Sequence, residues 1–242
     1  MDQQAFDDMS LTPGTASESA ERYVRALIFW GELGPGDRLP PATELAAQLG
    51  ISRVTLRIAL RSLETSGYLV TTRGAHGGSR VSDPRTLQRC WAQWMTDHLG
   101  ELDDIFEFRV TIERRLAELA AERRTAADLD AMEQALAGEI DNRERSSLFQ
   151  ADAGIHRSIA AAAHSPRLAL AMIAVRADLF LPVEEDLLDS TEDDVFATHQ
   201  RIVAAIRDGD PGRAALAAET HVLRVRDLVA RALEASGITA RA

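Results

Sequence analysis

The segment that most constrains the fold covers residues 39–67 and reads LPPATELAAQLGISRVTLRIALRSLETSG. Apolar residues recur at helical spacing on both sides of Gly50, so the segment predicts two short helices joined by a tight turn. Ser52 offers a side-chain oxygen at the expected N-cap of the second helix. That helix gathers leucine and alanine on one face and arginine on another, and such a helix is shaped to lie in a DNA major groove.

The flanking segments complete a recognisable unit. Thr15 and Glu18 form a capping-box pattern ahead of an apolar helical repeat, which predicts a helix before the pair. After Gly67, the runs YLVTTR and SRVS flank a glycine-rich stretch, which is typical of a hairpin with a flexible tip. We therefore expect a disordered tail over residues 1–14 and a winged helix-turn-helix domain over residues 15–83.

The rest of the chain is predicted to be helical. Residues 84–99 are expected to form a connecting helix, and residues 100–236 an antiparallel all-α bundle of six or seven helices. The apolar positions Ile105, Phe108, Ile112, Leu116 and Leu119 mark one long helix at its start. Breaks at Gly, Pro, Ser or Asp separate further helices near 126–137, 145–163, 167–181, 193–208 and 212–235. The fold class is thus mainly α.

Charge is unevenly distributed along the chain. The net charge of the whole sequence is -11. Between Arg38 and Arg80, however, six arginines face two glutamates, giving +4 and leaving -15 for the rest. A basic N-terminal segment in an otherwise acidic chain favours local docking of this segment on DNA over wrapping of DNA around the protein.

Cysteine content and hydropathy limit the cellular compartments in which the protein is expected. The single cysteine, Cys90, excludes an internal disulfide framework and is compatible with a reducing compartment. No apolar run is long enough to span a membrane, and residues 1–14 do not resemble a signal peptide. We expect a cytoplasmic protein with no membrane partner.

Arg53 and Arg57 are the leading candidates for DNA contact because they lie one turn apart near the start of the expected recognition helix. An arginine fork can bind guanine O6 and N7 bidentately, and neighbouring positions can hold phosphates. A solvated arginine face is the alternative, and His76 either enters a minor groove or occupies a mobile loop. The expected DNA-binding residues are Thr43, Arg53, Val54, Thr55, Arg57, His76 and Gly77.

A second set of candidates lies in the expected bundle. Asp152 and His156 are four residues apart and share one helix face, and His199 and His221 follow on later helices. One carboxylate and three imidazoles are a plausible ligand set for a divalent transition metal such as Zn²⁺, with Ni²⁺ and Mn²⁺ as alternatives. Histidines on a protein surface or hydrogen-bonded in a core are the competing explanation.

Arg109 has two explanations as well. Glu113 lies one helical turn further on, so an intrahelical salt bridge is expected. The alternative is a buried guanidinium that receives the carboxylate of a ligand. The sequence contains no nucleotide-binding glycine loop, HExxH or G-x-S-x-G motif, which weakens a catalytic interpretation.

Taken together, these segments resemble a known family. GELGPGDRLP, ELAAQLGISRVTLRIALRSLETSGYLV and the GG-containing wing resemble the N-terminal domain of GntR-family bacterial transcription regulators. The C-terminal part is similar to the FCD effector domain of the FadR subfamily, and the resemblance covers roughly residues 16–235. The residues that carry it in this part are Phe106 to Arg109, Glu113, Ala120 to Arg123, Asp152, His156, His199 and His221.

The resemblance implies that an FCD-like bundle binds a small organic acid through a metal held by Asp152, His156, His199 and His221. It implies that Arg109 contacts the acid and that the protein is a homodimer on a palindromic operator. One three-residue run and one single position depart from the family pattern. Pro41-Ala42-Thr43 replaces a Ser-Glu-Arg-like run, which removes a frequent DNA contact at Thr43, and His164 stands where asparagine is common.

The leading hypothesis is therefore that the protein is a transcriptional regulator that acts as a repressor. A small organic acid bound near a divalent metal would set its affinity for the operator. The junction over residues 84–99 would set the spacing of the two recognition helices. The alternative is a metal-dependent enzyme that acts on a small carboxylate and has an accessory DNA-binding domain.

Overall fold

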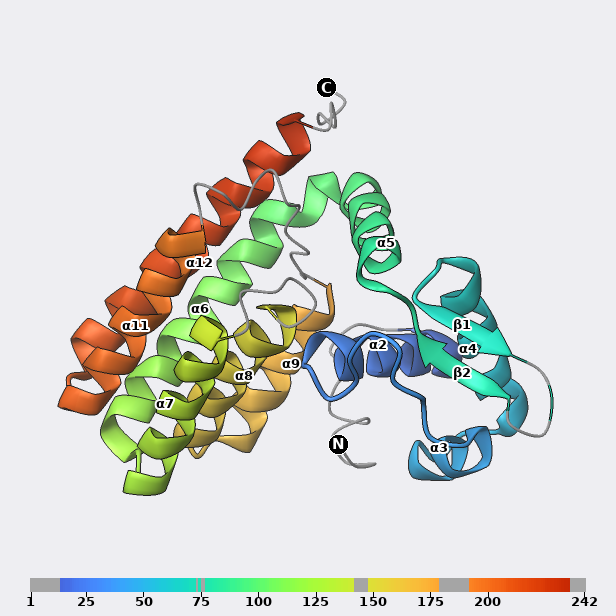
Figure 1. Ribbon diagram of the computed structural model, residues 1–242, viewed down its shortest axis with the longest axis horizontal. Coiled ribbons are helices and arrows are strands. Elements are labelled where there is room, and N and C mark those ends of the chain that lie inside the picture. Colours follow the sequence, from blue (N-terminus) through green and yellow to red (C-terminus); the bar gives the residue numbers. More distant parts are fainter. Residues whose placement is uncertain (1–13, 73, 75–76, 142–147, 179–191, 236–242) are drawn as a thin grey trace.

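The computed structural model describes residues 14–72, 74, 77–141, 148–178 and 192–235. Figure 1 shows a small unit with a two-stranded wing beside a larger bundle of long helices. The fold class predicted from the sequence is confirmed: the protein is mainly α, with a winged helix-turn-helix and an all-α bundle. The tail expected over residues 1–14 lies outside the described residues, apart from Gly14.

Local capping sets where the helices of the N-terminal unit begin. Its elements are α2 (Ala16–Phe29), α3 (Ala42–Gln48), α4 (Arg53–Thr65), β1 (Leu69–Thr72) and β2 (Gly78–Val81). The Thr15 hydroxyl accepts a hydrogen bond from the Glu18 N–H, and the Thr15 N–H donates to the Glu18 carboxylate, which is the predicted capping box. Ser52 caps α4 by accepting from the Thr55 N–H at 3.0 Å. Pro41 is the N-cap of α3 and makes no side-chain capping hydrogen bond.

The wing is a short antiparallel hairpin whose register runs from Leu69 opposite Val81 to Thr72 opposite Gly78. Leu69 and Val81 are buried, so the base of the hairpin belongs to the core of the unit. The segment before α3 extends the sheet, because the Leu39 N–H donates to the Ser79 carbonyl at 3.0 Å. The base of the wing is thereby held against the helix-turn-helix pair.

Helix α5 (Pro84–Asp97) connects the unit to the bundle. Asp83 caps it through the Thr86 N–H at 3.1 Å, and the thiol of Cys90 donates to the Ser66 carbonyl at 2.8 Å at the end of α4. Gly67 has a φ of +88°, and a Cβ there would lie 2.9 Å from the Cys90 sulfur. Glycine is therefore required for α5 to pack this closely on the helix-turn-helix.

A 3₁₀ turn, η1 (Leu99–Glu101), leads into the bundle. The described helices of the bundle are α6 (Leu102–Arg123), α7 (Ala126–Asp141), α8 (Leu148–Ala162), α9 (Pro166–Asp178), α11 (Glu192–Asp208) and α12 (Pro211–Ala235). Helix α6 runs along α12 and also packs against α8, α9 and α11 (Figure 1). This central position makes α6 the helix around which the bundle is assembled.

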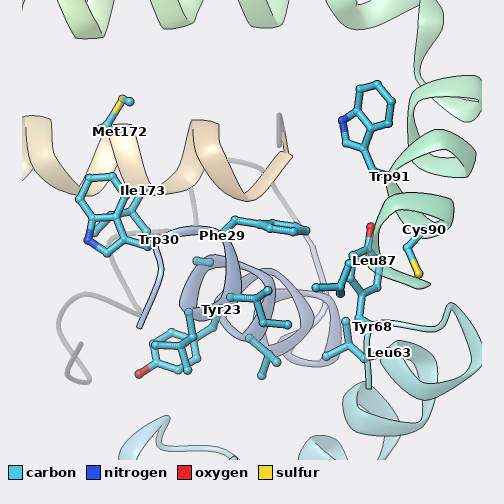
Figure 2. Close-up of a cluster of buried hydrophobic side chains, with 14 of the residues drawn as sticks. Tyr23, Phe29, Trp30, Leu63, Tyr68, Leu87, Cys90, Trp91, Met172 and Ile173 are labelled. Atoms are coloured by element: carbon cyan, nitrogen blue, oxygen red, sulfur yellow. The ribbon is translucent and has the colours of Figure 1, made fainter. Parts of the chain in front are cut away.

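The core of the winged unit is continuous with that of the bundle. Tyr23, Phe29 and Trp30 from α2 and its C-cap are buried in one cluster that also contains Met172 and Ile173 of α9. Figure 2 shows Trp30 beside Met172 and Ile173, with Phe29 on the side that faces Tyr68. The two parts of the molecule therefore share packed side chains in addition to the α5 connection.

None of the helices in the described part of the chain combines the length and the apolar character needed to cross a lipid bilayer.

Candidate functional site

Helix α4 presents two chemically distinct faces. Leu56, Ala59 and Leu63 are buried against the rest of the winged unit. Arg53 and Arg57, on the other face, are exposed, and neither forms an ion pair with any residue that the structure describes. All the N–H donors of these guanidinium groups are therefore available to an external partner.

Apolar side chains share the exposed face of α4. Val54 and Ile58, one turn apart, have exposed fractions of 61% and 56%. Val54 was among the predicted DNA-binding residues, whereas Ile58 was not. The sequence pattern could have identified Ile58, because it lies four residues after Val54 and off the face of Leu56. Exposed apolar residues beside arginines suit a DNA groove, where thymine presents a methyl group.

The other predicted DNA-binding residues have different surroundings. Thr43 is exposed in the first turn of α3, and Thr55 is half-buried with its hydroxyl 2.8 Å from the Ser52 hydroxyl. Gly77 is half-buried just before β2, and its N–H donates to the Gly74 carbonyl at 2.9 Å. His76 lies outside the described residues. The structure thus places Thr43, Thr55 and Gly77 near the recognition helix or in the wing.

The bundle brings three histidines together from three helices. His156 lies on α8, His199 on α11 and His221 on α12, and their exposed fractions are 4%, 0% and 0%. One ring nitrogen of each lies within 4.8 Å of those of the other two. The ring centroids of His199 and His221 are 4.4 Å apart, and that of His156 lies 5.3 and 5.1 Å from them. A fully buried cluster of this kind requires a chemical explanation, because histidine is seldom fully buried.

Two of these imidazoles leave a nitrogen without a hydrogen bond. The Nε2 atoms of His156 and His221 are buried and have no hydrogen-bond partner among the described residues. The opposite nitrogens are engaged: His221 Nδ1 lies 2.9 Å from the Thr198 hydroxyl, and His156 Nδ1 lies 3.4 Å from Glu113 Oε2. A ligand histidine is commonly held through its second nitrogen in this way.

Burial also favours the neutral, metal-binding form of His156 and His221. Burial lowers the pKa of His156, and the nearby carboxylate of Glu113 opposes this effect only in part. Burial, together with His199 and His156, lowers the pKa of His221 well below its usual range. Neutral imidazoles have lone pairs available for coordination at neutral pH.

Asp152 extends the cluster on the α8 side. Its Oδ1 lies 3.6 Å from Nε2 of His156 and 3.6 Å from Nε2 of His199, and its Oδ2 accepts a hydrogen bond from Arg176 at 2.5 Å. Burial acts to raise the pKa of Asp152, but the charge of Arg176 does most to oppose it, and this pKa lies well below its usual range. The carboxylate is therefore ionised beside the imidazoles.

Arg109 and Glu113 line the α6 side of the cluster. Arg109 Nε donates to Glu113 Oε1 at 2.5 Å, and the residues have exposed fractions of 3% and 5%. The salt bridge expected from the four-residue spacing is present, and the guanidinium is also buried. Burial acts to raise the pKa of Glu113, but the charge of Arg109 and its hydrogen bond do most to oppose it, and this pKa lies below its usual value.

A small cavity adjoins this cluster. It has an empty volume of about 250 Å³, part of which is open to solvent. Glu113 and His156 supply its polar lining, and Leu116, Ala117, Ile159, Met172, Ile202 and Ala218 supply the rest. Arg109 is not in this lining.

The donor set fits a divalent transition metal. Three imidazoles and a carboxylate match the nitrogen and oxygen ligands that Zn²⁺ takes in proteins. The two remaining described histidines, His98 and His164, lie elsewhere. His98 stacks on Trp94 at the end of α5, and His164 is bound to Asp128 at 3.0 Å. His164 has a φ of 46°, the left-handed conformation in which asparagine is also enriched.

The spacing of Asp152 and His156 is the local feature of the sequence that points to a metal. The folded chain adds Arg176 and Thr198 to this site, and it gives Glu113 a contact with His156 beyond the predicted pairing with Arg109. Each lies on a different helix from Asp152, so no local spacing connects them with it.

The comparisons with known proteins find a match for each of these two regions, the winged unit and the bundle. The model of the bacterial regulatory proteins of the gntR family matches residues 16–78, and the FCD domain matches residues 104–224. The HTH-type transcriptional regulator YcbG of Bacillus subtilis (strain 168) is 30% identical over 224 residues, which cover 90% of this chain and 91% of YcbG. The chain belongs to the GntR family.

Other known proteins are also similar to this chain along most of their length. The HTH-type transcriptional repressor NanR of Edwardsiella tarda (strain FL6-60) is 27% identical over 216 residues, covering 85% of this chain and 82% of NanR. The solved structure of McbR/YncC of E. coli shares the fold, with a TM-score of 0.50 and 19% identity over 90% of this chain and 99% of that one. This GntR-family chain is thus a DNA-binding transcriptional regulator with an FCD domain.

Proposed function

We propose that this regulator is controlled by a small organic acid that binds beside a divalent metal, with Zn²⁺ as the first candidate. The observation that carries the proposal is the buried histidine cluster, whose ring nitrogens lie within 4.8 Å of one another. Asp152 would complete the ligand set, since its Oδ1 is 3.6 Å from two of the imidazoles. When bound, the metal supplies a Lewis acid that attracts the carboxylate of the effector.

Arg109 is proposed as the second group that holds the acid. Its Nε is bound to Glu113, so the other nitrogens of the guanidinium are the ones that would receive a carboxylate. The cavity that adjoins the cluster is lined by Glu113 and His156 among apolar side chains, so an acid bound there would meet both polar and apolar surfaces.

On the DNA side, we propose a homodimer that binds a palindromic operator and acts as a repressor, as the similar protein NanR is named. Arg53 and Arg57 would bind guanine edges or phosphates, and Val54 and Ile58 would contact thymine methyl groups. The exposure of these four side chains on one helix supports this arrangement.

Metal content tests the first part of the proposal. The purified protein should contain about one divalent metal per chain, and a His199→Ala/His221→Ala variant should lose it because two buried ligands are removed. The matched control is His98→Ala/His164→Ala, which changes two histidines outside the cluster and should leave the metal content unchanged. Full retention in the cluster variant would refute the metal site.

A ligand screen tests the second part. The Tm of metal-loaded protein is measured in the presence of hydroxy and keto acids of three to six carbons. The corresponding amides serve as uncharged controls. An acid that raises Tm should fail to do so after chelation of the metal, and its effect should be reduced in Arg109→Lys, which retains the charge but not the planar fork. The same acid should change the affinity for a promoter-proximal palindrome in fluorescence anisotropy. Acids and amides of equal effect would contradict the proposal.

A further inference from the structure

Arg176 is a buried charge next to the histidine cluster that the proposed ligand set does not use. It lies on α9, which contributes no histidine, and it has an exposed fraction of 4%. Its guanidinium donates to Oδ2 of Asp152 at 2.5 Å, while Oδ1 of the same carboxylate lies 3.6 Å from the Nε2 atoms of His156 and His199. Asp152 is therefore held between α9 on one side and the imidazoles on the other.

This arrangement determines which carboxylate oxygen faces the histidines. Rotation about the last side-chain bond of an aspartate would otherwise exchange or turn away its oxygens. A charged hydrogen bond to one oxygen, in a partly buried site, restricts that rotation and leaves the other oxygen towards the cluster. We propose that Arg176 is a positioning residue that orients Asp152 for the metal. This inference rests on the proposed metal site.

Helix α9 has a second contact that gives Arg176 a wider role. Ile173 and Met172, about one turn before Arg176, are buried with Trp30 at the end of α2 (Figure 2). The same helix thus touches Asp152 through one residue and the winged unit through two others. A displacement of α9 at Arg176 would therefore be transmitted to Trp30 along α9 itself, without involving α5.

Helix α8 docks on the same part of the winged unit. Arg157, the residue after His156, donates to the Trp30 carbonyl at 2.8 Å. Gly31 has a φ of +72°, and a Cβ there would lie 3.0 Å from the Cβ of Ala153, the residue after Asp152. The two helices that hold Asp152 and Arg176 are therefore those on which Trp30 and Gly31 rest. The ion pair between α8 and α9 links the metal site to this docking contact.

Zn²⁺ affinity is the first measurement. The full-length protein is stripped of metal and titrated with Zn²⁺ in competition with a chromophoric chelator. Arg176→Met, which retains length but not charge, should bind Zn²⁺ about 10- to 100-fold more weakly than the parent. Arg176→Lys should recover part of the loss, because it restores the charge. The control is Arg167→Met, which changes an exposed arginine on the same helix and should leave the affinity unchanged.

The second measurement follows Trp30. The chain has three tryptophans, so Trp91→Phe/Trp94→Phe leaves Trp30 as the only one. Saturating Zn²⁺ should change the Trp30 emission in this background, and the change should be smaller when Arg176→Met is added. Circular dichroism verifies that each variant keeps its helical content. If Arg176→Met does not fold, Arg176→Lys replaces it, with a smaller but measurable loss of affinity expected.

The outcomes separate this inference from the proposed function. A parent protein that binds no Zn²⁺ overturns both. A parent that binds Zn²⁺, with Arg176 variants that bind it equally or more tightly, overturns the positioning role alone and leaves the metal site in place. Unchanged Trp30 emission in the Zn²⁺-saturated parent background overturns the link to the winged unit.

Discussion

Arginine has opposite surroundings in the two parts of this molecule. On α4, Arg53 and Arg57 are exposed and have no ion-pair partner in the described part of the chain. In the bundle, Arg109 and Arg176 have exposed fractions of 3% and 4% and are paired with carboxylates. A solvated guanidinium is available to phosphates and base edges, whereas a buried one is committed to a partner because an unpaired buried charge is costly. The arginines of α4 are thus free to meet an external partner, whereas those of the bundle hold carboxylates inside the fold.

The largest effect is expected from breaking a buried pair. Glu113→Ala leaves Arg109 as an uncompensated buried charge, so the free energy of unfolding should fall by about 3–5 kcal/mol. Glu118→Ala is the control, because it breaks the largely exposed pair with Arg115 and should cost less than about 1 kcal/mol. Urea denaturation measures both, and similar losses would show that the buried and exposed pairs are equivalent.

Substitution of an exposed arginine should affect DNA binding rather than stability. Arg57→Ala should weaken operator binding by about 1–3 kcal/mol and leave stability nearly unchanged, because the side chain is solvated in the free protein. Binding should also become less dependent on salt if Arg57 contacts a phosphate. Fluorescence anisotropy at several salt concentrations provides the measurement. Arg115→Ala, an exposed arginine of the bundle, is the control and should bind DNA as the parent does; an unchanged affinity in Arg57→Ala would count against the DNA face.

A smaller effect is expected from the apolar part of the same face. If Ile58 contacts a thymine methyl group, replacing thymine by uracil in an operator found by in vitro selection should weaken parent binding about fourfold, from about 0.8 kcal/mol per buried methyl-sized group. The Ile58→Ser variant should bind the two operators with more similar affinities, because the contact is already lost. Equal sensitivity to uracil in the parent and the variant would exclude this contact.

The smallest effect concerns α5, between the two parts. Asp83→Ala removes the N-cap of this helix and should lower the free energy of unfolding by at most about 1 kcal/mol at neutral pH. Hydrogen bonds from the Thr86 side chain and backbone lower the pKa of Asp83, so its ionised form stabilises the folded state. That contribution is present above the unfolded pKa of about 4 and is lost as the pH falls through the lower folded value.

The difference in Tm between the parent and Asp83→Ala should therefore become smaller at acidic pH. Thermal melts at several pH values measure this difference. Asp97→Ala changes an exposed carboxylate at the other end of α5 and serves as the control. A difference that does not depend on pH would show that the charge of Asp83 contributes nothing to the cap.

The winged unit was predictable because its determinants are local. Thr15 and Ser52 cap their helices through residues three positions away, and the glycine-rich stretch separates the two strands at the expected place. The site in the bundle was predictable in part. The spacing of Asp152 and His156 places both on one helix face. No local spacing connects His199 and His221 with them, so their place in the ligand set was a hypothesis that the family resemblance strengthened.

The amino-acid sequence by itself determined which segments are helical, where the wing lies and which face of α4 is polar, since backbone capping and apolar periodicity act over a few residues. Tertiary structure alone decided that Arg176 meets Asp152 and that α9 rests on Trp30. The rotation of one helix against another depends on the packing of all their side chains, and the partners of a buried charge are set by that rotation. For this reason, the residues that connect the histidine cluster to the winged unit became visible only in the folded protein.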